Sequence, residues 1–165
     1  MIALKNILVA TDFSDPSKVA LDYGRDLARS YGARLHVLHI VQDLSYHYGG
    51  EIGFPLADLQ TQCVAEARKE LDALITDDDR RGLRIVSDVQ TLVSPAYGIV
   101  EYAKENAIDL IVTGTHGRGA VEHFFMGSVA ERVVRTAPCP VLTVRSPERD
   151  FIAPDALSTV EVAAK

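Results

Sequence analysis

Four residues between positions 114 and 128 have the types and the spacing of a phosphate-binding loop. They are three glycines and a hydroxyl residue: Gly114, Gly117, Gly127 and Ser128. Because glycine has no Cβ, consecutive N–H groups around Gly114 and Gly117 can turn toward one anion. Gly127 and Ser128 open a predicted helix, whose first N–H groups lack helical partners and whose dipole carries about half a positive charge there. The pattern predicts a polyphosphate site.

Side chains in and beside this loop could add to such a site. Ser128 offers a hydroxyl group, and Arg118 offers a mobile positive charge. His116 lies inside the loop, so His116 or Asp12 could orient a water molecule for slow hydrolysis of a phosphate. A histidine flanked by glycines can equally fold its ring onto the loop. Catalysis by these residues is therefore one alternative and a purely structural role is the other.

An alternation of strands and helices must position the loop. Apolar runs of strand length, which are typical of sheets covered on both faces, predict strands at 6–10, 35–41, 83–92, 109–113 and 141–144. Apolar residues at helical spacing predict helices at 16–31, 59–75, 94–106 and 128–135. Such alternation implies right-handed crossovers onto one parallel sheet with helices on both faces. The predicted fold class is therefore α/β.

The loop follows the fourth predicted strand, which places it at the carboxyl edge of the sheet. Open α/β sheets bind ligands beyond this edge, where the strand order reverses. If the first and fourth strands are neighbours there, Asp12 and Gly114 face one crevice. Asp12 can then accept hydrogen bonds from ribose hydroxyls or orient the hydration of a divalent ion. Its alternative role is to cap the following turn.

The spacing of glycine, two residues, glycine, nine residues, glycine and serine resembles the ATP-binding branch of the universal stress protein family. Further segments that look like the family lie at 9–14, 35–39, 127–131 and 137–142, so the resemblance covers about residues 4–145. It implies a single-domain three-layer sandwich, similar to the adenine nucleotide alpha hydrolases, with a five-stranded parallel sheet in the order 3-2-1-4-5. We expect the domain to span residues 1–146 and a partly ordered tail to span 147–165.

The resemblance also implies a ligand and its contacts. The expected cofactors are ATP and Mg²⁺, with Asp12 at the metal. Carried over by position, the base falls on Ala10 and the main chain of Ile40, and the ribose on Asp12 and Gly114. The whole expected binding set is Ala10, Thr11, Asp12, Ile40, Gly114, Thr115, His116, Gly117, Arg118, Gly127, Ser128 and Val129.

The resemblance implies a homodimer formed by antiparallel pairing of the last strand, 141–144. We expect a nucleotide-dependent regulatory protein of the stress response, because only Asp12 and Arg118 are candidates for the groups that phosphoryl transfer requires. Two alternatives stay open. One is a slow Mg²⁺-dependent ATP hydrolase, and the other is a partner-binding module that takes no nucleotide. The sequence does not identify a protein partner.

Composition narrows the classes of partner. With 165 residues and a formal charge of −6, the chain is an acidic domain of ordinary size. This charge argues against broad binding to nucleic acid or to an anionic membrane. No apolar run reaches the ~18–20 residues that cross a bilayer, and the N-terminus has no basic region followed by a cleavage site. We therefore expect a cytoplasmic protein.

The remaining polar clusters favour structural roles. His36 and His39 point to opposite faces of a strand, so they cannot hold one metal together. Cys63 and Cys139 are expected to pack as small buried hydrophobes, since two unpatterned cysteines suit a reducing compartment. The acidic run 77–79 is expected to form a solvated turn. The long connection 42–55 could cover a base, meet a partner or form an ordinary surface loop.

Overall fold

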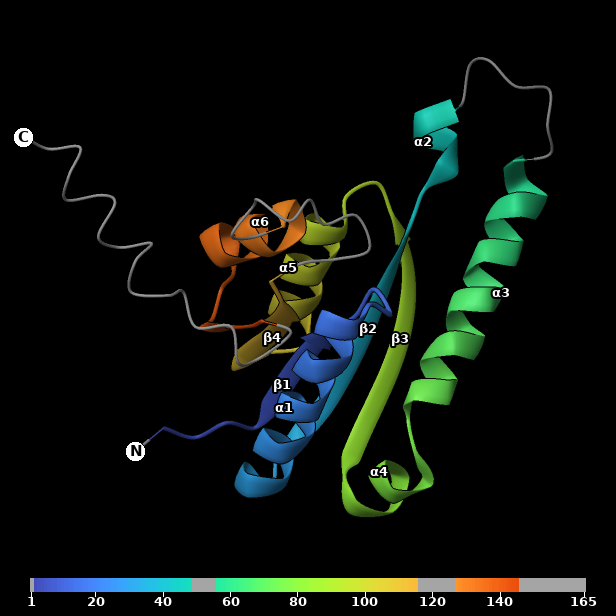
Figure 1. Cartoon of the computed structure of the whole chain (residues 1–165). Coiled ribbons are helices and arrows are strands. Elements are labelled where there is room, and N and C mark those ends of the chain that lie inside the picture. Colours follow the sequence, from blue (N-terminus) through green and yellow to red (C-terminus); the bar gives the residue numbers. More distant parts are fainter. Residues whose placement is uncertain (1, 49–55, 116–126, 146–165) are drawn as a thin grey trace, which may run out of the picture.

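The computed structural model describes residues 2–48, 56–115 and 127–145, and Figure 1 shows how their strands and helices alternate. The strands are β1 (Asn6–Ala10), β2 (Arg34–Gln42), β3 (Arg84–Leu92), β4 (Leu110–Gly114) and β5 (Val141–Val144). The helices are α1 (Asp15–Tyr31), α2 (Leu44–Tyr48), α3 (Leu56–Leu74), α4 (Asp77–Gly82), α5 (Pro95–Glu105) and α6 (Ser128–Thr136). Each predicted strand and each of the four predicted helices is confirmed to within a few residues.

The strands form one parallel sheet in the order β3-β2-β1-β4-β5, which confirms the predicted order. β1 lies at the centre, with Ala10 paired to Leu38 of β2 on one side and to Thr113 of β4 on the other. The chain runs outward in one direction from β1 to β3 and in the other from β4 to β5. The reversal between β1 and β4 is where such sheets bind ligands.

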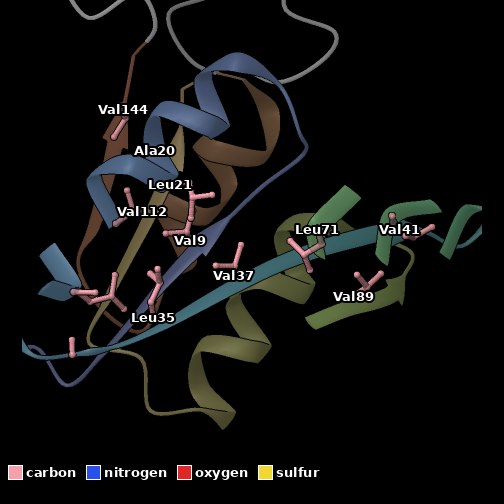
Figure 2. Packing of buried hydrophobic residues seen from close by; sticks show 14 residues of the cluster. Val9, Ala20, Leu21, Leu35, Val37, Val41, Leu71, Val89, Val112 and Val144 are labelled. Carbon is pink, nitrogen blue, oxygen red and sulfur yellow. The ribbon is translucent and has the colours of Figure 1, made fainter. Parts of the chain in front are cut away.

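Alternate residues of each central strand enter two separate cores, because successive side chains of a strand point to opposite faces. Figure 2 shows one core, where Val9, Leu35 and Val112 of the sheet meet Leu21 of α1 and Leu71 of α3. Leu8, Leu38 and Ile111 enter the other core, beneath α5 and α6. Each fully buried aliphatic side chain contributes roughly 1.5–3 kcal/mol. The two cores confirm the three-layer arrangement.

Helix α1 ends where the sequence predicts. Gly32 has a φ of +62°, the left-handed conformation that favours glycine, and its N–H points back to the last turn of the helix. The N–H of Ala33 also donates to the carbonyl of Ala28 at 2.9 Å, and β2 begins at the next residue, Arg34. This short connection sets the register between β1 and β2.

The acidic run 77–79 begins α4 and is not a turn. Asp77 and Asp78 are exposed as predicted, but the prediction of a solvated side chain is wrong at Asp79. Asp79 is 1% exposed and caps α4 together with Thr76. Its carboxylate lies 2.8 Å from Nη2 of Arg25 and 3.3 Å from Nη2 of Arg29, both on α1. Burial alone would raise the pKa of Asp79, but hydrogen bonds from Arg25 and Thr76 outweigh it and lower the pKa. This buried ion pair ties α4 to α1.

The other structural expectations have mixed outcomes. The connection after β2 contains the short helix α2, and residues 49–55 lie outside the described part of the chain, as does the expected tail 147–165. Cys63 and Cys139 are free thiols, half-buried, each packed against one of the two cores. Burial raises the pKa of the Cys139 thiol. No helix among the described residues is both long and apolar enough to span a membrane.

Candidate functional site

A cavity of about 340 Å³ lies at the carboxyl edge of the sheet, over the reversal between β1 and β4. Its volume is within the range of roughly 300–1,000 Å³ that is typical of small-molecule sites. The walls come from the ends of β1, β2 and β4 and from the first turns of α1, α5 and α6. The lining residues are Ala10, Thr11, Asp12, Ser17, Leu38, His39, Ile40, Pro95, Ile99, Thr113, Gly114, Thr115, Gly127, Ser128, Val129 and Ala130.

The structure brings most of the sequence-predicted site residues together around this cavity. Three of them, His116, Gly117 and Arg118, lie outside the described residues. The predicted residues that line the cavity are Ala10, Thr11, Asp12, Ile40, Gly114, Thr115, Gly127, Ser128 and Val129.

The N-terminus of α6 supplies main-chain donors to the cavity. Its first helical hydrogen bond runs from the N–H of Glu131 to the carbonyl of Gly127 at 3.0 Å. The N–H groups of the three residues between them, 128–130, have no acceptor among the described residues, and all three residues line the cavity. Unpaired donors at the positive end of a helix dipole form a ready anion site.

The predicted donor at Gly127 itself is not available. Its N–H donates to the carbonyl of Thr115 at 2.6 Å, and the N–H of Thr115 donates to the carbonyl of Val144 at 2.8 Å. These two bonds fasten the start of α6 to the end of β4 and to β5. The donors therefore begin at Ser128, one residue later than the sequence indicates.

Gly114 is required for a different reason from the predicted one. Its φ is not positive, so the backbone does not need glycine for its conformation. A Cβ at this position would instead lie 3.0 Å from the carbonyl carbon and from the Cβ of Pro16. Gly114 lets the first turn of α1 approach the end of β4, and this approach closes one wall of the cavity.

Asp12 occupies the turn between β1 and α1. One carboxylate oxygen accepts a hydrogen bond from the N–H of Ser14 at 3.1 Å and another from the Ser14 hydroxyl. This is the capping role that the sequence left as the alternative. Because Asp12 is only half-buried and lines the cavity, the ligand role stays a prediction.

The main chain of Ile40 faces the cavity because β2 is longer than β1. In a parallel strand, the N–H and C=O of one residue point to the same neighbouring strand, and the direction alternates along the chain. Arg34 and Leu38 bond to β1, through Arg34 N–H to the Lys5 carbonyl at 2.7 Å and Thr11 N–H to the Leu38 carbonyl at 3.0 Å. By alternation Ile40 faces the same side, where β1 has already ended at Ala10.

Sequence reasoning missed several residues of the site. His39 is hydrogen-bonded, as the sequence predicts, with its Nδ1 2.8 Å from the carbonyl oxygen of Thr11, but its place on the cavity wall was not predicted. Ser17 is buried and hydrogen-bonds to Thr11 Oγ1 at 3.1 Å and to the Ser14 carbonyl at 2.8 Å. The signal that could have identified His39 is its position, because it interrupts the apolar row of β2.

His36 has the structural role that the sequence predicts. It is 4% exposed, and its Nδ1 lies 3.0 Å from the hydroxyl of Tyr102 on α5. Burial lowers the pKa of His36 and raises that of Tyr102, since both charged forms would be poorly solvated there. This pair fastens α5 to β2 beneath the cavity.

Among the described residues, no group of three or more His, Cys, Asp or Glu side chains could hold a metal ion. Among the described residues that line the cavity, Asp12 is the acidic one.

Comparisons with known proteins agree on one family. The model of the universal stress protein family matches residues 3–145. A universal stress protein of Methanocaldococcus jannaschii is 32% identical over 151 residues, which cover 88% of this chain and 85% of that protein. The structure of UspA from Lactobacillus plantarum has a TM-score of 0.71 at 27% identity and covers 88% of this chain and 100% of that one. The structure of a universal stress protein in complex with cAMP has a TM-score of 0.57 at 26% identity and covers 88% of this chain and 99% of that one.

Proposed function

The chain belongs to the universal stress protein family, and from this premise we propose that it binds an adenine nucleotide, ATP with Mg²⁺, in the cavity at the carboxyl edge of the sheet. The observation that carries the proposal is the convergence of two main-chain sites on one cavity. The N–H groups at the start of α6 suit phosphates, and the edge of β2 at Ile40 suits a base. The cAMP complex of a relative supports the same class of ligand.

The phosphate end of the proposed site lies at α6. Three consecutive main-chain donors from Ser128 onward lack acceptors among the described residues. Phosphate oxygens would accept hydrogen bonds from these donors, and the helix dipole would favour their negative charge. The hydroxyl of Ser128 can add one more hydrogen bond. Gly117 and Arg118 stay predicted contributors from the sequence.

The base end of the proposed site lies at Ile40 and Ala10. The N–H and C=O of Ile40 together present one donor and one acceptor. An adenine ring can meet both, because its N1 accepts and its N6 amino group donates. Ala10 is small and buried, which leaves space for the flat ring beside it. Asp12 also lines the cavity and is our proposed contact for the ribose and the metal.

We propose a binding protein that acts as a regulatory homodimer of the stress response, and not a fast enzyme. β5 lies at the edge of the sheet and pairs only with β4 among the described strands. An apolar edge strand of this kind favours pairing with a second copy. The bonds from the N–H of Thr115 to the Val144 carbonyl and from the N–H of Gly127 to the Thr115 carbonyl connect this edge with the phosphate end. A cytoplasmic location stays a prediction from the sequence.

Equilibrium dialysis with radiolabelled ATP and Mg²⁺ tests the proposal. We expect retention of one nucleotide per subunit, and a mass spectrum under non-denaturing conditions should show a dimer carrying nucleotide. No retention at millimolar ATP would favour the partner-binding module. Turnover near the median enzyme rate of ~10 s⁻¹ would overturn the proposal that the chain is a binding protein.

A further inference from the structure

In a regular parallel ladder the Ile40 amide would donate to the carbonyl of Thr11. Here the side chain of His39 is hydrogen-bonded to that carbonyl instead. The ladder between β2 and β1 begins with the N–H of Arg34 donating to the carbonyl of Lys5. The same offset continued along β2 would join the N–H of Ile40 to the carbonyl of Thr11. Between these described residues that bond is absent, although the preceding bond, from Thr11 N–H to the Leu38 carbonyl, is present at 3.0 Å.

The Thr11 carbonyl is bound by His39 instead. The Nδ1 atom of His39 lies 2.8 Å from this oxygen. A carbonyl oxygen can only accept, so Nδ1 carries the proton. The ring of Phe13 packs against the imidazole with their centroids 4.4 Å apart and their planes at 32°. Phe13 itself, two residues after Thr11, has a φ of +66°, the left-handed conformation.

His39 is polar and half-buried, whereas the other residues of its row on β2 are apolar and buried. His39 belongs by alternation to the row that Leu35, Val37 and Val41 form on one face of β2, and all three of these residues are buried in the core of Figure 2. A valine at position 39 would continue that row. It would also leave the Thr11 carbonyl without its present donor, next to the N–H of Ile40.

We propose that His39 is a positioning residue that holds the Thr11 carbonyl away from the Ile40 amide, so that this amide stays available for the base of the ligand. The role of the amide in binding rests on the proposed function. The diversion of the carbonyl does not, because it is a property of the protein without ligand.

Amide hydrogen exchange of the full chain without nucleotide tests the diversion directly. We expect the Ile40 amide to exchange about fivefold or more slowly in His39→Val than in the original protein, the factor that one net hydrogen bond is worth. His39→Asn, whose side-chain amide can still donate near the Nδ1 position, should leave exchange at Ile40 nearly unchanged. The Leu38 amide, inside the ladder, serves as the internal reference. Equal exchange at Ile40 in the original protein and in His39→Val would overturn the proposal.

Binding by the same variants separates this proposal from the proposed function. We expect His39→Val to weaken the binding of adenosine and of ATP by about fivefold or more and to leave the affinity for inorganic tripolyphosphate unchanged. His39→Asn should bind all three ligands about as tightly as the original protein. If His39→Val slows exchange but binds adenosine as tightly as the original protein, the positioning role is wrong. If the original protein binds neither nucleotide nor tripolyphosphate, the proposed function fails, while the exchange result still decides whether His39 diverts the carbonyl.

Discussion

Ser128→Asp should separate ligand binding from stability, because its two effects have opposite signs. Ser128 is the first residue of α6, exposed, and lies on the cavity wall. A carboxylate there would face the positive end of the helix dipole and stabilise the folded protein by about 0.3–1 kcal/mol. A phosphate bound to the amides at the start of α6 would face the same carboxylate, and we take about 5 Å as the separation of the two charges. At an effective dielectric constant of about 20, repulsion between unit charges is about 3 kcal/mol, which is about a hundredfold in Kd.

Titration calorimetry with ATP and thermal unfolding without it would measure both effects. We expect Kd to rise about a hundredfold at low salt, and less at high salt because Ser128 is solvent-exposed. The melting temperature should be equal to or above that of the original protein. Ser128→Asn is the matched control, since it is close to Asp in size and carries no charge. An Asp variant that binds ATP within threefold of the Asn variant would refute the assignment of phosphates to the start of α6.

Two further predictions concern the frame around the site. Gly114→Ala should destabilise the protein by about 1–3 kcal/mol in a denaturant titration, because the added Cβ would lie 3.0 Å from the backbone of Pro16. Gly82→Ala is the control and should be nearly neutral, because a Cβ there meets nothing within 4 Å. Asp79→Asn should cost roughly 3 kcal/mol at pH 7 by leaving Arg25 without its buried partner. Because the folded-state pKa of Asp79 lies below its ordinary value of 3.8, the original protein should lose this stabilisation as the pH falls below about 4, and the variant should not.

The fold was largely predictable because its strands are continuous apolar runs. The bounds of β1 (Asn6–Ala10) were predicted because a buried parallel strand contains few polar residues, and those of β5 (Val141–Val144) because an apolar run begins directly after Pro140. Helix α2 (Leu44–Tyr48) was missed, because five residues are too few to display a helical period. Its sequence is hard to distinguish from a loop.

Tertiary contacts explain the errors at single residues. Asp79 and Arg25 are 54 positions apart in the sequence. A local sequence pattern cannot predict a buried ion pair between two helices so distant along the chain. Gly114 was selected for the correct position and the wrong cause, since only the folded chain shows Pro16 against it. The sequence predicts a packed or hydrogen-bonded His39, which its contacts with Thr11 and Phe13 confirm; its place on the cavity wall was not predicted, because that depends on where β1 ends relative to β2.

A site built from main-chain groups suits a protein of this charge. With a formal charge of −6, the chain as a whole does not attract a polyanion electrostatically. Any affinity for a polyanion must therefore come from groups within a few ångströms of the bound ligand. The three amides that begin α6 act over that range, and they need no lysine or arginine to hold them in place because the helix itself orients them. The bonds through Thr115 fix this helix start against β4 and β5. Position on the sheet, more than side-chain chemistry, therefore determines what this cavity can bind.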